Sequence, residues 1–348
     1  MDCKTDNSKT GKPYGTADGR RIRISMLYAI CTVAVVALFA LDLATGSVQI
    51  PLGDVWAALT GGDCPRTTAR IVLNIRLVKA LVAVMAGAAL SVSGLQMQTL
   101  FRNPLAGPYV LGISSGASLG VAIFILGAPL LGLTGALSSV GVAGAAWTGA
   151  AAVLAIIAAI GHRIKDIMVI LILGMMFASG VSAVVQILQY LSNEEALKAF
   201  VIWTMGSLGD VTTAQTAVMA PSVVLGLLLA VVAVKPLNLL LFGEDYAVTM
   251  GLNIRRSRTL IFLSTTLLAG SVTAFCGPIG FIGLAMPHVT RMLYNDADHR
   301  VLVPATMLTG AAVMLVCDLV SKLFVVPVNA ITALLGIPVV VWIVLKKR

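Results

Sequence analysis

The strongest constraint on this chain is a series of long apolar stretches that contain no Lys, Arg, Asp or Glu. About 20 consecutive apolar residues suffice for one helical crossing of a membrane. A soluble domain carries about 25% charged residues, whereas this 348-residue chain carries 11%. It has too few solvated side chains to coat a globular surface, so we exclude a soluble enzyme, a disordered chain and a secreted disulfide scaffold. The charge-free stretches cover residues 24–41, 80–101, 103–162, 167–193, 211–234, 259–290, 301–317 and 323–345.

Two of these stretches do not fit a single crossing. Residues 103–162 hold two predicted spans, separated by a break at the Gly- and Pro-rich residues 127–135. Residues 259–290 are long for one span and short for two. Gly277 and Pro278 interrupt them, because glycine weakens a helix and proline removes a backbone donor. The sequence therefore predicts an all-α polytopic membrane protein with about ten transmembrane helices.

The basic residues predict how these spans are oriented. With ten spans, the 24 Lys and Arg residues divide 18 to 6 between the two sides. Cytoplasmic loops carry the excess of Lys and Arg, so we predict that both termini are cytoplasmic. A single crossing in residues 259–290 would place Arg291, Arg300 and the basic C-terminal tail outside, which the rule disfavours. The net charge of +9 is then an orientation signal, and no nucleic-acid partner is expected.

The organisation along the chain is simple. Residues 1–23 form a predicted polar cytoplasmic tail, and residues 24–348 form a single transmembrane domain. The first apolar run is longer than the core of a signal peptide and lacks a convincing cleavage site, so we interpret it as a span. The five cysteines form no Cys-x-x-Cys pair and the three histidines are unclustered in sequence. We therefore expect no metal site, no disulfide and no cofactor bound by this chain itself.

The apolar stretches offer no chemistry for ion coupling. A carrier driven by protons or sodium ions needs a titratable or ion-ligating group near mid-depth, whereas Asp42, Asp210 and Asp318 lie at predicted span ends. We interpret His288 as a hydrogen-bonded packing residue rather than a proton relay. No segment matches the Gly-x4-Gly-Lys-Ser/Thr pattern that binds ATP phosphates. If the protein is a pump, its energy source lies on another chain.

Two polar segments are not explained by packing alone. In residues 100–117, an Asn-Pro and a Gly-Pro pair predict a turn at the inner membrane face. In residues 242–256, Glu244 and Asp245 open a predicted short helix, because carboxylates are stabilised at the positive N-terminus of a helix. Gly251 is placed to end that helix. The second segment is either a solvated loop with a capped helix or a docking helix for a cytoplasmic partner.

Several motifs of this sequence resemble those of one known family. The first polar segment is similar to an Arg-Asn-Pro-Leu-Ala…Leu-Gly…Ser-x-Gly-Ala motif. Residues 243–252 resemble a Gly-Glu…Ala…Leu-Gly motif, with Met250 where Leu is usual, and residues 277–291, 298–304 and 327–338 match further blocks in the same order. These motifs belong to the membrane permeases of ABC importers for iron-siderophores, haem and vitamin B12. The resemblance runs from about residue 25 to the C-terminus.

This resemblance implies a fold, partners and functional residues. Two copies of a ten-span subunit would enclose a translocation path in the lipid bilayer of a bacterial cytoplasmic (inner) membrane. Two cytoplasmic ATPase subunits would bind ATP and Mg, and an extracytoplasmic substrate-binding protein would deliver the ligand. The chain would be a transport component and not an enzyme. The implied coupling segment, about residues 236–258, includes Gly243, Glu244, Asp245, Ala247, Gly251 and Leu252, and the implied cytoplasmic gate includes Asn103 and Leu105.

Basic residues on the outer side also gain an interpretation from the family. Its members carry Arg-Leu-Pro-Arg before the second span, and this chain has Arg76 and Lys79 at the two basic positions. Lys322 matches a third basic position. The resemblance implies that all three meet carboxylates on the binding protein, although a lysine lacks the bidentate fork of arginine. The alternative is that these long side chains snorkel to the membrane interface.

The leading hypothesis is the permease subunit of an ATP-driven importer that moves a bulky metal chelate by alternating access. The alternatives are a gradient-driven secondary transporter and a membrane-embedded enzyme, which would need clustered His, Asp or Cys side chains. Siderophore, haem and cobalamin permeases share these motifs, so the identity of the chelate stays open. Met175, Met176 and Met205 either line the path or fill the core.

Overall fold

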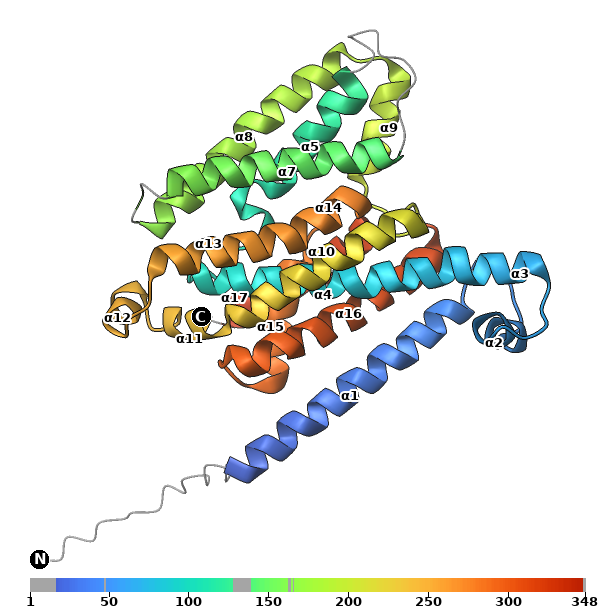
Figure 1. Ribbon diagram of the computed structural model, residues 1–348, viewed down its shortest axis with the longest axis horizontal. Helices are drawn as coiled ribbons and strands as arrows, with labels where there is room; N and C mark the ends of the chain where they lie inside the picture. The colour runs from blue at the N-terminus through green and yellow to red at the C-terminus, as the bar shows by residue number, and fades with distance from the viewer. Residues whose placement is uncertain (1–16, 47, 128–138, 162–163, 165, 347–348) are drawn as a thin grey trace, which may run out of the picture.

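The computed structural model describes residues 17–46, 48–127, 139–161, 164 and 166–346. Every regular element in these ranges is helical, which confirms the predicted all-α class (Figure 1). The first half contains α1 (Ala17–Ala44), α2 (Leu52–Thr60), α3 (Arg66–Ile71), η1 (Val72–Arg76), α4 (Leu77–Leu100), η2 (Pro108–Leu111), α5 (Ile113–Ala122), η3 (Ile123–Gly127), α7 (Ser139–Gly161) and α8 (Ile167–Leu191). The second half contains α9 (Glu194–Thr204), α10 (Thr213–Val232), α11 (Val234–Leu240), α12 (Glu244–Thr249), α13 (Ile254–Thr265), η4 (Thr266–Gly270), α14 (Ser271–Cys276), α15 (Ile282–Tyr294), α16 (His299–Phe324) and α17 (Val328–Lys346).

Length and apolar character confirm a protein with several membrane-spanning helices. Residues 1–16 of the predicted tail lie outside the described residues, as do residues 128–135 of the predicted break, and α1 already begins within that tail. Shorter apolar helices occur at Ile113–Gly127, Gly141–Ile157 and Val328–Trp342. The helical stretches long and apolar enough to cross a membrane are Gly19–Ala44, Arg66–Leu100, Ile167–Leu191, Thr213–Val232, Ile254–Cys276 and His299–Phe324.

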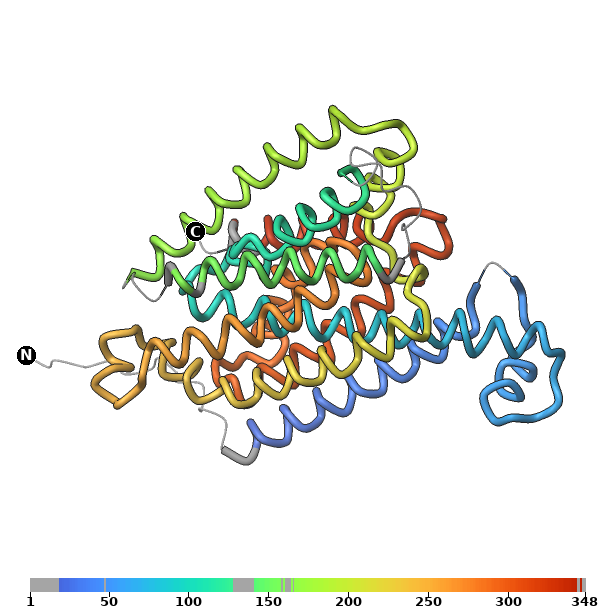
Figure 2. The backbone as a smooth tube through the Cα atoms, turned by 45° about the horizontal axis from the view of Figure 1, so that its top comes forward, coloured from blue at the N-terminus to red at the C-terminus, as the bar shows by residue number. Residues whose placement is uncertain are grey.

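The bundle has two distinguishable ends (Figure 1). The elements α11 and α12 lie at one end, here named the α12 end, and α2 and α3 lie at the other, the α2 end. Helix α1 begins toward the α12 end and α17 finishes toward it (Figures 1 and 2). The first and last described helices therefore place both ends of the described chain at the same end of the bundle.

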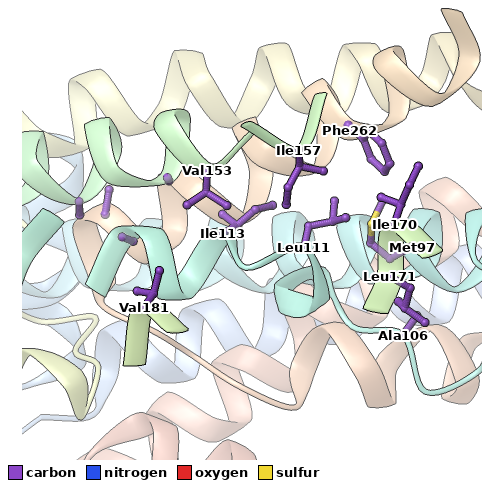
Figure 3. Packing of buried hydrophobic residues seen from close by; sticks show 14 of the residues in the cluster. Met97, Ala106, Leu111, Ile113, Val153, Ile157, Ile170, Leu171, Val181 and Phe262 are labelled. Carbon is purple, nitrogen blue, oxygen red and sulfur yellow. The ribbon is translucent and has the colours of Figure 1, made fainter. Parts of the chain in front are cut away.

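Glycines allow α4 to pack backbone against backbone with its neighbours. A Cβ atom at Gly94 would lie 1.6 Å from the carbonyl oxygen of Gly283 in α15, and one at Gly87 would lie 2.3 Å from that of Gly310 in α16. Small residues permit this approach where no water-driven effect holds helices together. In a second group, formed by α5, α7 and α8, glycine also allows close packing: a Cβ atom at Gly149 in α7 would lie 2.1 Å from the carbonyl oxygen of Gly116 in α5. This group buries larger side chains as well, including those of Ile113, Val153 and Ile170 (Figure 3).

Two segments that interrupt the long helices meet inside the bundle: residues 101–112, which include the short helix η2, and residues 277–281. Helix α4 ends at Leu100, and residues 101–112 then run back into the bundle to reach α5, so this segment is more than the turn predicted at the membrane face. The hydroxyl of Tyr109 donates to the carbonyl of Ile279 at 2.9 Å. Ile279 belongs to residues 277–281, which separate α14 from α15 and confirm the predicted break there. Irregular backbone is tolerated at membrane depth where protein surrounds it.

Candidate functional site

The short helix predicted at Glu244 is present with the predicted boundaries. Helix α12 begins at Glu244, directly after Gly243, whose φ of 105° favours glycine. Gly251, at φ 82°, follows the helix, and its N–H donates to the carbonyl of Val248. The N–H of Leu252 donates to the carbonyl of Ala247 at 2.9 Å. This pair of bonds satisfies the last helical carbonyls, as in a Schellman motif.

A buried arginine ties α12 to the next helix. Arg258 Nη2 lies 2.7 Å from both carboxylate oxygens of Glu244, and its Nε lies 3.2 Å from Oε1. Ala247, on the inner side of α12, is fully buried, while Asp245 is exposed. Charge-assisted bonds of this kind are about twice as strong as neutral ones. The short helix therefore has a fixed orientation that α12 alone could not maintain.

The outer side of α12 is apolar and exposed. Phe242 and Met250 are 70% and 58% exposed, and the rings of Phe242 and Tyr246 lie 5.4 Å apart. Large side chains of this kind, exposed beside charged residues at the end of a membrane bundle, are typical of a protein contact. We name this surface the α12 patch, and it consists of Phe242, Tyr246, Val248 and Met250.

The predicted gate residues follow Arg102, whose side chain approaches the coupling segment. Asn103 Oδ1 accepts a hydrogen bond from the N–H of Leu105 at 2.9 Å, which closes a local turn, and Leu105 is 48% exposed. Arg102 has a φ of 48°, and a Cβ at Gly243 would lie 3.4 Å from its Nη1. Arg102, two residues after α4, therefore lies close to Gly243, directly before α12, which the sequence alone did not indicate.

At the α2 end, Arg76 faces backbone rather than solvent. It is only 4% exposed, and its Nη1 donates to the carbonyls of Leu43 and Ala44 at 2.9 and 3.0 Å. Its Nη2 donates to the carbonyl of Val48. The guanidinium thus satisfies carbonyls at and beyond the C-terminus of α1, where a cation is also favoured by the helix dipole.

The two lysines predicted for docking belong to a buried ion cluster. Lys322 Nζ lies 2.7 Å from Asp42 Oδ2 and 3.0 Å from Asp318 Oδ2, and Lys79 Nζ lies 3.0 Å from Asp318 Oδ1. Both carboxylates are almost completely buried. We name Asp42, Lys79, Asp318 and Lys322 the α2-end cluster; it joins α1, α4 and α16.

A cavity of about 600 Å³ opens beside this cluster, and Arg76, Lys79 and Lys322 line it. The structure thus brings together all three predicted docking residues but gives each an internal partner. The roles of Asp42 and Asp318 were missed in the sequence. The four-residue spacing of Asp318 and Lys322 is a signal that could have indicated their pairing, whereas nothing local pointed to Asp42.

The two histidines among the described residues, His288 and His299, have structural partners. The His288 ring Nε2 lies 2.7 Å from the carbonyl oxygen of Pro104, which agrees with the packing role predicted for it. His299 is buried between Thr99 and Asn238. In the described part of the chain, no group of three His, Cys, Asp or Glu side chains is placed to hold a metal ion.

Comparison with known proteins identifies the family to which this chain belongs. Residues 34–346 match the model of the FecCD transport family. The haemin transport system permease HmuU of Yersinia pestis is 35% identical, over 94% of this chain and 96% of its own. The vitamin B12 import permease BtuC of Shigella boydii is 34% identical, over 94% and 97%. The ferric enterobactin permease FepD of Escherichia coli is 34% identical, over 88% and 91%.

One solved structure extends the comparison to the fold. It is described as an inward-facing conformation of a metal-chelate type ABC transporter. It superposes with a TM-score of 0.80 at 29% identity, covering 92% of this chain and 99% of that one. The motif order, the helical bundle and the full-length relatives agree, and the chain belongs to the FecCD transport family.

Proposed function

We propose that this chain is the permease subunit of an ATP-binding-cassette importer and that it moves a bulky metal chelate across the membrane. The observation that carries this proposal is the α12 patch, an exposed apolar surface next to Gly243, which lies close to the side chain of Arg102, the neighbour of the predicted gate residue Asn103. A partner that docks there acts directly beside the path. The relatives named for haemin, vitamin B12 and ferric enterobactin support a chelate of this size and class as the cargo.

The proposal includes a specific arrangement in the membrane. The chain crosses ten times with the α12 end in the cytoplasm of a bacterial cell, because the described residues form helices in each of the ten predicted spans and the basic residues favour that side. Two copies enclose the path. Each α12 patch receives one ATPase subunit, and these partners bind ATP and Mg, since this sequence has no Walker A segment.

The proposed binding-protein contact lies at the α2 end. Lys79 and Lys322 line the cavity there, and both already pair with Asp318. A carboxylate of the binding protein would share these ammonium groups rather than meet unpaired cations. Arg76 would shape the same surface by fixing the end of α1.

Reconstitution tests this function. The chain is purified with the ATPase and binding protein encoded by neighbouring genes and placed in proteoliposomes, with haemin, cyanocobalamin and ferric enterobactin as separate probes. We expect uptake of one of the three probes. This uptake should require ATP and Mg on the side of the membrane that carries the ATPase, and it should continue when an uncoupler removes the proton gradient. Uptake that needs no ATPase and stops with the uncoupler at constant ATP would establish a gradient-driven transporter instead.

A further inference from the structure

A buried histidine at the α12 end joins three helices. His299 is fully buried at the start of α16. Its Nε2 lies 2.8 Å from the hydroxyl of Thr99 in the last turn of α4, and its Nδ1 lies 2.7 Å from Oδ1 of Asn238 in α11. The imidazole is rigid and its two nitrogens lie on different edges. It therefore sets the separation between α4 and α11.

The surrounding hydrogen bonds determine which ring nitrogen of His299 donates and which accepts. Asn238 Oδ1 also accepts from the backbone N–H of His299 at 2.8 Å, and its Nδ2 donates to Asp298 Oδ1 at 2.6 Å. Because the amide oxygen of an asparagine only accepts, the His299 Nδ1 must be the donor. In the neutral ring, Nε2 then accepts from the Thr99 hydroxyl, whose single proton can also be donated to the carbonyl of Leu95 at 2.9 Å. The contact is directional at both nitrogens.

On one side, this contact reaches the gate residues. The carbonyl of Thr99 accepts from the N–H of Arg102, and that of Gln98 accepts from the N–H of Asn103, both at 3.2 Å. Arg291 Nη1 donates to Gln98 Oε1 at 3.0 Å and holds the same turn against α15. Movement of Thr99 therefore displaces the start of the segment that carries Asn103 and Leu105.

On the other side, the contact reaches the coupling segment. Asn238 lies in α11, which ends at Leu240, and the N–H of Gly243 donates to the carbonyl of Leu240 at 3.1 Å. Glu244 then begins α12 and is held by Arg258. A displacement of α12 is thus passed to Asn238 through a few backbone bonds.

We propose that His299 is a positioning residue that transmits movement of the coupling segment, through Asn238, to Thr99 and the gate. This inference rests on the proposed function. It predicts that breaking the His299–Thr99 contact leaves ATP hydrolysis active but separates it from transport. A merely structural role would lower both activities together.

The test uses the reconstituted importer and measures both uptake and ATP hydrolysis, with the probe that the unchanged chain transports. Thr99→Val removes the hydroxyl without changing the side-chain shape, and leaves His299 Nε2 unsatisfied. It also removes the contacts of that hydroxyl with the Leu95 carbonyl and Arg291 Nη2, at 2.9 and 3.5 Å. Loss of a buried hydrogen-bond partner is expected to lower the amount of probe transported per ATP hydrolysed by about fivefold or more. Thr99→Ser keeps the hydroxyl and should restore the ratio to within about twofold of the unchanged chain, well inside the loss expected for valine.

Thr306→Val is the matched control. Its hydroxyl is equally buried in α16 but has no hydrogen-bond partner among the described residues, so the ratio should not change. An unaltered ratio in Thr99→Val, or an equal fall in Thr306→Val, would overturn the inference while leaving the proposed function intact. If the unchanged chain shows no ATP-driven uptake of any probe, the proposed function fails, and the inference fails with it.

Discussion

Replacing Asp318 by Asn tests the α2-end cluster directly. The carboxylate is 1% exposed, and each of its oxygens lies 3.0 Å from a different lysine. Asn keeps the shape, but it removes the charge and turns one amide N–H₂ toward an ammonium group. Removing one partner of a buried ion pair costs about 3–5 kcal/mol. Because the Lys79 side chain is 20% exposed and can recruit water, we expect the lower value, about 3 kcal/mol.

The measurement is the free energy of unfolding of the purified chain in mixed detergent micelles, followed by tryptophan fluorescence during titration with a denaturing detergent. Asp210→Asn is the control, because that carboxylate lies at the same end and is exposed. Exposed ion pairs contribute about 0–1 kcal/mol to stability, so the free energy of unfolding of this variant should differ little from that of the unchanged chain.

A double-mutant cycle identifies the partner. Lys79→Met combined with Asp318→Asn removes both charges of one pair, so the double variant should lose less stability than the sum of the two single variants. Contacting residues show interaction energies of about 0.5–3 kcal/mol. A loss below about 1 kcal/mol for Asp318→Asn, or strict additivity in the cycle, would refute the assignment of a buried, cooperative cluster.

Three further predictions address packing, the coupling helix and docking. Gly94→Ala should lower the melting temperature in detergent, because its Cβ would lie 1.6 Å from a backbone oxygen, while Gly144→Ala, with open space around it, should not. Glu244→Gln should raise hydrogen exchange of α12 by roughly 10-fold or more, since the bond to Arg258 is charge-assisted; unchanged protection would contradict that role. Lys322→Glu should weaken binding-protein affinity, and more so at low salt; equal affinity at low ionic strength would exclude docking there.

Local signals predicted the parts of this structure that depend on neighbouring residues. The boundaries of α12 followed from Glu244 and Gly251, because dipole and capping effects act within one helical turn. The break at Gly277 followed from backbone chemistry for the same reason. The absence of charge within the apolar stretches predicted a membrane bundle without any knowledge of its packing.

Contacts between distant residues could not be predicted from one sequence. Tyr109 lies in η2 and meets Ile279 only because two segments that interrupt the long helices enter the bundle together. The residues around each give no local indication of the other. Arg76 looked like a surface cation, but the carbonyls that it contacts lie 28 to 33 residues earlier in the chain. Side-chain partners of this kind depend on tertiary geometry, which periodicity and composition do not specify.

The α2-end cluster has a consequence for synthesis of the chain. Asp42 is translated 280 residues before Lys322, its partner at 2.7 Å. Arg76 follows much sooner and can hold α1 beside α4 by its bonds to backbone carbonyls. Until α16 has been made and inserted, however, the Asp42 carboxylate lacks the ammonium group that neutralises it. Firm attachment of the first helix therefore awaits almost the whole of translation, and a truncated chain that ends before Lys322 would retain an uncompensated charge at the edge of the bilayer.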